Sequence, residues 1–204
     1  MRVIRMLAFA FGRYNRERKA NFALEIAERL GVQSALLVGV SDQPGPVNNV
    51  VEARIAAHVP YTVASGLGLD GSGEWTTYVV ADGLQLPFRD RSFDLVYANA
   101  VIEHVGDEDA QRILAREAAR VGKVWIITTP NRWFPIEAHY HTLFSHWSSW
   151  WAPKGTVTRL LGIRDLRRLV PSGVVRGTPF LSPTLTAIGT SQRRSSEREE
   201  AVRE

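Results

Sequence analysis

The residues of this chain best suited to hold a ligand lie where two apolar runs meet. The β-rich run 76–81 ends at Asp82, and a second apolar run begins at Phe93 after a short connecting segment. In an open α/β sheet, ligands bind in the crevice outside the carboxyl ends of the strands, so Asp82 is placed to accept hydrogen bonds there. This layout is typical of a nucleoside pocket.

A second candidate is the turn after the apolar run 34–38, where Gly39 precedes Val40 and Ser41. Glycine lets the backbone turn sharply and approach a nucleotide or nucleoside closely. The Gly-x-Gly-x-x-Gly pattern of nicotinamide-dependent oxidoreductases is absent, which makes that class the less favoured prediction.

The segment 82–96 resembles the pattern D-x-x-x-L-P-F-x-D-x-S-F-D-x-V of a small group of class I S-adenosylmethionine-dependent methyltransferases. The resemblance covers about residues 30–135 well and the rest loosely. It implies an α/β fold, a doubly wound and mostly parallel seven-stranded sheet with helices on both faces. It also implies S-adenosyl-L-methionine as cofactor.

In this resemblance, Asp82 lies near the adenine amino group, and Gly83 and Leu84 line the ring. Asn99 and Ala100, after the fourth strand, lie against the methionine part of the donor. The full set of cofactor-binding residues that the resemblance implies is Gly39, Val40, Ser41, Ser65, Asp82, Gly83, Leu84, Asn99 and Ala100.

The chain departs from the family pattern at two positions where carboxylates are expected. Leu37 replaces the acid of the first strand, and Ser65 replaces the acid that would bind the ribose hydroxyls. A serine can exchange hydrogen bonds with ribose but lacks the strength of a charged acceptor. Two interpretations stay open: methyl transfer to a small molecule at an O, N or C centre, or a donor-binding-deficient protein acting as a partner or scaffold.

The segment 128–141 gathers polar groups, prolines and aromatic residues where a doubly wound sheet builds its active site. We expect Asn131, Arg132, Trp133 and His141 to bind the acceptor. We expect His104 or His139 to act as general base, because imidazole titrates near neutrality.

Five of the six tryptophans fall between residues 125 and 151, and they could form the walls of an apolar acceptor pocket. The alternative is a flap that closes the end of the sheet or faces a membrane interface. The histidines of this region have no recognised zinc spacing, and no metal is expected. The tryptophans are Trp125, Trp133, Trp147, Trp150 and Trp151.

The amino-acid composition excludes several kinds of functional site. The chain has 204 residues, 45% of them hydrophobic, and no cysteine, which excludes disulfides, a thiolate nucleophile and a Cys-based zinc site. These features fit a cytoplasmic protein. The net charge of +4 is concentrated at residues 1–19, which hold six Lys or Arg and one Glu. This basic arm could make weak contact with a membrane surface or be a solvated helix face; no nucleic-acid module is visible.

The expected domains are a basic arm with an entry helix (1–30), a methyltransferase-like domain (31–189) and a disordered charged tail (190–204). The entry helix is predicted over 15–30, with Phe22, Ile26 and Leu30 as its apolar stripe. Further helices are predicted over 47–58, 106–121 and 163–170. Strands are predicted over 34–38, 61–64, 76–81, 93–98, 123–128, 173–176 and 184–189.

Overall fold

The computed structural model of the protein describes residues 2–41, 48–68, 73–136, 143–147 and 157–191, with the backbone alone for residues 2–10. Within them, seven strands form one sheet in the order β3-β2-β1-β4-β5-β7-β6. β7 runs antiparallel to β5 and β6, and the other pairs are parallel. The predicted doubly wound sheet is confirmed. The strands are β1 Ser34–Val38, β2 Tyr61–Gly66, β3 Thr77–Val80, β4 Phe93–Asn99, β5 Gly122–Pro130, β6 Val174–Arg176 and β7 Thr184–Thr190.

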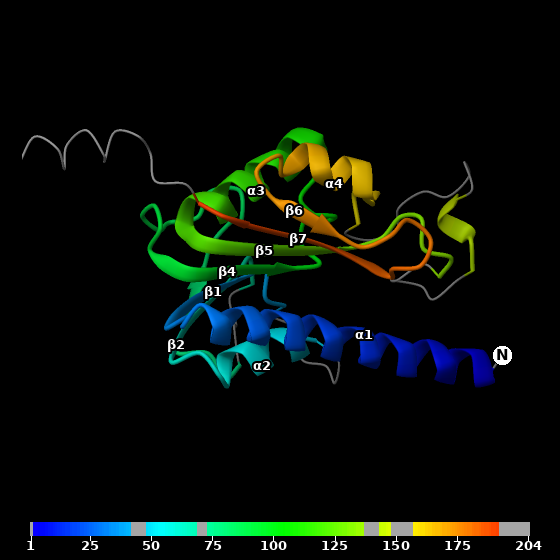
Figure 1. Ribbon diagram of the computed structural model, residues 1–204, viewed down its shortest axis with the longest axis horizontal. Coiled ribbons are helices and arrows are strands. Elements are labelled where there is room, and N and C mark those ends of the chain that lie inside the picture. Colours follow the sequence, from blue (N-terminus) through cyan, green and yellow to red (C-terminus); the bar gives the residue numbers. More distant parts are fainter. Residues whose placement is uncertain (1, 42–47, 69–72, 137–142, 148–156, 192–204) are drawn as a thin grey trace, which may run out of the picture.

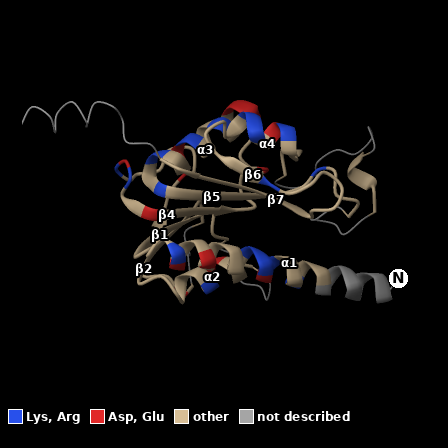
Figure 2. Ribbon diagram, viewed as in Figure 1, with Lys and Arg blue, Asp and Glu red and all other residues tan. Residues whose placement is uncertain are grey.

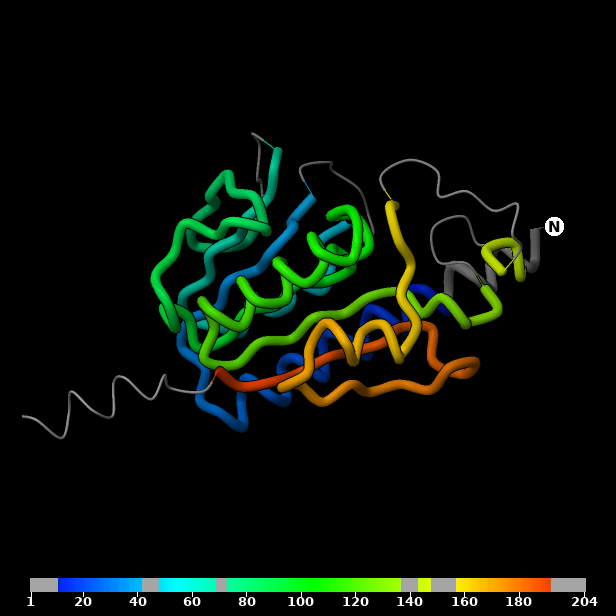
Figure 3. The backbone as a smooth tube through the Cα atoms, turned by 90° about the horizontal axis from the view of Figure 1, so that it is seen from above, coloured from blue at the N-terminus to red at the C-terminus, as the bar shows by residue number. Residues whose placement is uncertain are grey.

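Helices cover both faces of this sheet. Figures 1 and 3 show α1 and α2 on one face, and α3 and α4 on the other. Charged residues gather on the helices and turns, while most of the sheet is free of them (Figure 2). None of the helices in the described ranges is long and apolar enough to cross a membrane. The helices are α1 Arg2–Arg29, α2 Val50–Ala56, α3 Glu108–Val121 and α4 Ile163–Leu169, with a 3-10 turn at Ser145–Trp147.

Helix α1 differs from the prediction in its length and in the face it buries. It begins at Arg2, so the basic arm is helical throughout its described backbone. Its buried contacts are the alanines Ala20, Ala23 and Ala27, whereas Leu30 is 56% exposed. Of the predicted stripe, Phe22 and Ile26 are partly buried against this cluster, and only the prediction for Leu30 is wrong. Small side chains let the helix axis lie close to the sheet, a packing solution that a search for large apolar residues misses.

Trp125 lies in the core and not in an acceptor pocket. It is 1% exposed and belongs to the cluster between the sheet and helices α3 and α4. Gly173 and Gly189 make room for it, because a Cβ on either would come within 2.4 or 2.2 Å of its ring. The prediction that placed this tryptophan in a pocket wall is wrong, since Trp125 is an inward-facing strand residue.

The turn from β3 to β4 is held by side chains of α3: Glu117 accepts from the Leu86 amide at 2.8 Å, and Arg120 makes the further contacts. Arg120 donates to the carbonyls of Phe88 (2.7 Å) and Leu86 (2.9 Å) and pairs with Asp90 at 3.0 Å. Fixing this turn sets the direction in which the chain enters β4. The Leu-Pro-Phe segment is therefore structural, as its turn chemistry predicts.

We expect Trp125→Ala to lower the free energy of unfolding by about 3–5 kcal/mol, because it removes a buried ring and leaves a cavity. Trp133→Ala is the matched control, since Trp133 is 41% exposed and its loss should cost about 1 kcal/mol or less. Denaturant unfolding at equilibrium measures both. Equal losses in the two variants would contradict the core position of Trp125.

Candidate functional site

The strand register brings the ends of β1, β2 and β4 to one level. Val38 pairs with Ser65 on one side and with Ala98 on the other. The amides of Gly39 and Val40 both donate to the Ser65 carbonyl, at 2.8 and 2.9 Å. The turn after β1 is thus fixed against the end of β2, and residues predicted from three separate strands meet at the carboxyl edge of the sheet.

Gly39 fits this turn for two reasons. Its φ of 77° lies in the left-handed region, and a Cβ on it would lie 2.3 Å from Cγ2 of Val101. Val101 follows β4, so the first turn of the site packs directly on the segment where the methyl end of a donor is expected. Any side chain at position 39 would push these two segments apart.

Ser65 supplies a polar group that nothing in the described residues satisfies. Its side chain is 1% exposed, and its Oγ has no hydrogen-bond partner there. Beside it, a Cβ on Gly66 would lie 2.5 Å from the Val40 carbonyl. A buried hydroxyl without a partner costs free energy unless something binds it. The residues present therefore fit a ligand that offers hydroxyl groups at the end of β2.

Asp82 is exposed and already supports its own loop. Its Oδ1 accepts a hydrogen bond of 2.9 Å from the Leu84 amide. Gly83 packs toward Leu114, whose Cδ1 would lie 2.7 Å from an added Cβ, and Leu84 packs against the core. One carboxylate oxygen therefore caps the loop, and Oδ2 has no hydrogen bond among the described residues. Ser41 is likewise engaged locally, through its amide and carbonyl with the side chain of Asn49.

Asn99, at the end of β4, is the centre of a buried polar network. Its Oδ1 accepts from the Lys19 ammonium at 2.7 Å and from the Thr128 hydroxyl at 2.8 Å. Its Nδ2 donates to Oε1 of Glu52 at 2.9 Å. A single amide thereby joins α1, α2, β4 and β5. Contact of Asn99 with the methyl donor stays a prediction, whereas the structure shows that its side chain connects these four elements.

The charged groups of this network are desolvated. Burial raises the pKa of Glu52 above its ordinary value, against the lowering effect of Asn99 and Lys19. Desolvation lowers the pKa of Lys19, while the carboxylates of Glu52 and Glu103 oppose it. Lys19 is half-buried and lines two cavities, and its ammonium donates to Oδ1 of Asn99. The Lys19–Asn99–Glu52 network therefore holds one basic and one acidic side chain together at the carboxyl end of β4.

The segment that follows β4 is fastened to the chain after residue 156. Glu103 is fully buried, and its Oε2 accepts from the Thr129 hydroxyl at 3.0 Å. Its carbonyl accepts from the amides of Thr158 and Arg159. His104 lies next to it, half-buried, in a turn where its amide donates to the Val101 carbonyl.

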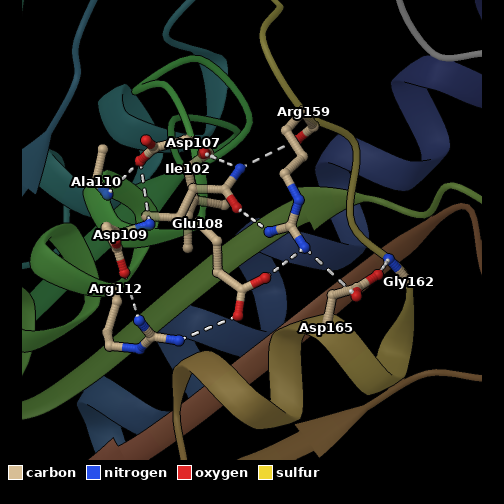
Figure 4. Close-up of polar contacts among 10 residues, drawn as sticks. Ile102, Asp107, Glu108, Asp109, Ala110, Arg112, Arg159, Gly162 and Asp165 are labelled. Atoms are coloured by element: carbon tan, nitrogen blue, oxygen red, sulfur yellow. Dashed lines mark hydrogen bonds and ion pairs between the residues drawn. The ribbon is translucent and has the colours of Figure 1, made fainter.

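Arg159 completes this attachment (Figure 4). Its guanidinium donates to Oε1 of Gln111 at 2.6 Å and to Glu108 at 2.9 Å, and lies 3.5 Å from Asp165. The Gln111 amide in turn donates to the Ile102 carbonyl at 3.0 Å. One cation therefore joins the amino-terminal ends of α3 and α4 to the loop that carries His104.

A cavity of about 200 Å³ lies between α1 and the ends of β4 and β5. Lys19 and Arg16 of α1 line one side, and Ala100 and Thr129 line the other. Phe134 adds an apolar wall, and its ring stacks on Phe11 at 5.6 Å between centroids. We call this space the α1 cavity. It adjoins the carboxyl edge of the sheet at Ala100.

The predicted acceptor residues that the structure describes differ in their surroundings. Asn131 is 4% exposed, and its Nδ2 donates to the carbonyls of Thr178, Pro179 and Ser182, so its amide holds the β6–β7 turn and is not available to an acceptor. His139 and His141 lie outside the described residues.

Trp133 and Arg132 are exposed residues of the turn after β5. The Arg132 guanidinium lies 5.5 Å from the centre of the Trp133 ring. Trp133 also packs near Trp147 and Phe180, so the exposed aromatic residues of this turn pack on one another. Of the other tryptophans, Trp150 and Trp151 lie outside the described residues.

The sequence analysis missed Lys19 and Glu52 as site residues. Lys19 was counted only in the charge of the arm. Glu52 carried a signal, because it precedes Ile55 by three positions on the apolar stripe of α2, where a charged residue must find a buried partner.

Comparisons with known proteins show which sequences and folds this chain is similar to. Residues 45–124 match the sequence family described as "Methyltransferase domain". Over these residues the chain is similar to a methyltransferase domain. The match includes Ser65, Asp82 and Asn99 but begins after the Gly39 turn, and no curated protein matches the chain in sequence.

Solved structures of methyltransferases share the fold of this chain at low identity. The N-methyltransferase NodS from Bradyrhizobium japonicum WM9 has 13% identity and a TM-score of 0.56, over 89% of this chain and 98% of its own. The methyltransferase domain of bacterial CtHen1 has 10% identity and a TM-score of 0.62, over 86% and 99%. Magnesium protoporphyrin IX methyltransferase (ChlM) from Synechocystis PCC 6803, with bound S-adenosylhomocysteine (SAH), has 12% and 0.58, over 88% and 85%. At these identities the likeness establishes the fold.

We expect Lys19→Met to lower the free energy of unfolding by about 3 kcal/mol at pH 8, because it leaves the Glu52 carboxylate buried without its cation. Removing the cation raises the pKa of Glu52 further. An acid whose folded pKa is raised loses stability as the pH rises from its ordinary value of 4.5 through the folded value. The deficit of Lys19→Met should therefore be smaller at pH 5 than at pH 8.

The double variant Lys19→Met/Glu52→Gln is the control, since it removes both charges and should recover part of the loss. Denaturant unfolding at both pH values measures the full cycle. Additive losses with no pH dependence would contradict the coupling of the two groups.

Gly39→Ala should lower stability by more than Gly31→Ala does. Both glycines have a positive φ, of 77° and 61°, but only Gly39 faces a side chain within 4 Å of the added methyl. We expect about 1–2 kcal/mol for Gly31→Ala, from backbone strain alone. Gly39→Ala should lower the free energy of unfolding by about 1–3 kcal/mol more, because the added methyl group overpacks against Val101. The double variant Gly39→Ala/Val101→Ala should recover part of this extra loss. Thermal unfolding of the three variants checks this order.

Proposed function

We propose that this protein transfers a methyl group from S-adenosyl-L-methionine to a small-molecule acceptor. The observation that carries the proposal is the position of Ala100. It follows β4 at the edge where the donor's methionine part is expected, and it also lines the α1 cavity. The methyl end of the donor and the acceptor would thus both lie beside Ala100. In-line transfer requires that the two reacting atoms lie close together and aligned.

The donor would lie across the carboxyl edge of β1, β2 and β4. Ser65 would bind a ribose hydroxyl, which supports the proposal because its buried Oγ lacks a partner among the described residues. Oδ2 of Asp82 would accept from the adenine amino group, with Gly83 and Leu84 against the ring. Gly39 and Val40 would let the backbone approach closely.

The protein's own tasks are to align the acceptor, exclude water and remove a proton. When bound, S-adenosylmethionine supplies a methyl group activated by the positive sulfur. A lone pair of the acceptor would form the new bond to this methyl carbon, and the electrons of the broken bond would stay on sulfur. For an O or N acceptor, His104 or His139 is proposed to take the released proton. Arg132, Trp133 and His141 stay proposed acceptor contacts, while Asn131 is withdrawn because it holds the β6–β7 turn.

The second candidate is a protein of this fold that does not bind the donor and acts as a partner or scaffold. Two features favour it. Leu37 is fully buried in the core where a carboxylate is expected, and Asp82 already accepts from its own loop. Donor binding separates the two functions. Arg16 and Lys19 of the basic arm line the α1 cavity. Weak contact of the arm with a membrane surface stays a proposal.

We expect S-adenosylmethionine and SAH to bind in the micromolar range, roughly −8 kcal/mol, by titration calorimetry. Asp82→Ala and Asp82→Asn should both weaken binding about tenfold. Asparagine keeps the acceptor for the Leu84 amide but places a donor where the adenine amino group also donates.

Asp82→Asn thereby separates direct contact from loop support. If only Asp82→Ala weakens binding, the carboxylate acts through its loop. If the folded wild-type protein binds neither compound, the scaffold function replaces the enzymatic one.

A further inference from the structure

A second cavity, of about 180 Å³, lies beside the α1 cavity and is lined by three cationic residues. Arg18 and Lys19 come from α1, and Arg176 comes from β6. Within the described part of the chain, no acidic residue lines it. We call it the cationic cavity. It lies at the ends of β5, β6 and β7, away from the β1 and β2 edge proposed for the donor.

Two of these cations have no acidic partner among the described residues. The Arg176 guanidinium lies 5.0 Å from the centre of the Phe22 ring, and Arg18 lies 6.0 Å from that of Tyr14. Neither forms a salt bridge within the described ranges. Aromatic faces orient the guanidinium groups without neutralising them. Their donors are therefore available to an anion, for which guanidinium is the preferred side chain.

Neutral hydrogen-bonding groups complete the lining. The Asn15 amide donates to the Thr184 hydroxyl at 2.8 Å, and both residues line the two cavities. Lys19 and Thr128 are also shared. The two cavities thus adjoin each other along these shared polar residues, and an extended molecule can occupy both.

The two cavities differ in chemistry. The α1 cavity has an apolar wall of Phe11, Phe134 and Ile136, with Pro130 and Pro183 beside them. Each cavity alone is smaller than the roughly 300–1,000 Å³ of ordinary ligand sites, whereas both together reach that range. A ligand of ordinary size would therefore place an apolar part in the α1 cavity and an anionic part in the cationic cavity.

We propose that the acceptor is an amphiphile with an anionic head, a carboxylate or phosphate, which the cationic cavity binds while its apolar body fills the α1 cavity toward Ala100. This inference rests on the proposed function and narrows its substrate class. Arg18 and Arg176 act as specificity residues that fix the head. The body is thereby positioned with its reactive atom at the donor edge.

The test compares decanoate with decanol, which share an apolar chain and differ in charge, and adds inorganic phosphate as a head without a body. Calorimetry on the full chain should give at least tenfold tighter binding of decanoate than of decanol, and weaker binding of phosphate than of decanoate. Arg18→Gln/Arg176→Gln should weaken decanoate about tenfold and leave decanol unchanged. Arg167→Gln, an exposed arginine of α4 on the other face of the sheet, is the matched control and should change neither.

Equal affinity for decanoate and decanol, or an equal loss in the Arg167→Gln control, would overturn the inference. SAH binding by the same variants separates it from the proposed function. The double variant should bind SAH as the wild type does, because its arginines lie away from the donor edge. If the wild type binds decanoate preferentially but not SAH, methyl transfer fails and the anionic subsite stands as a binding site.

Discussion

The hydrogen bonds of Asn99 to Lys19 and Glu52 are the interaction on which the site depends. They hold α1 at the end of β4, and the amino-terminal part of the helix extends past the edge of the sheet (Figure 1). Both cavities exist because this helix runs over the ends of β5 and β7. The described side chains at the end of the basic segment thus line both cavities.

Such a network contributes more to position than to net stability. Desolvating two opposite charges costs about as much as their attraction returns, unless the geometry supplies further hydrogen bonds. Asn99 supplies them, since its amide can satisfy a cation and a carboxylate only in one orientation. The alanines of α1 then set how closely the helix approaches the sheet, and the network sets where along the sheet it stops.

The sequence predicted the sheet well because each strand is a short apolar run between turn residues. The run 34–38 matches β1 at both ends, and the Leu-Pro-Phe turn before β4 occupies the position that its residues indicate. Proximity across the fold could not be predicted in this way. Lys19 and Glu52 stand 33 positions apart, and nothing in either local pattern indicates that one asparagine joins them. Asn131 and Trp125 were assigned to a pocket by composition, whereas contacts distant in sequence place the first on a turn and the second in the core.

The central claim is that the donor lies across the carboxyl edge, with its methyl end toward the space beneath α1. A crystal structure of the protein with SAH tests this directly. The account predicts adenosine between Ser65 and Asp82, and the homocysteine part beside Asn99 and Ala100 with its sulfur facing the α1 cavity. Density for the compound at another surface, or a sulfur turned away from Ala100, would contradict it.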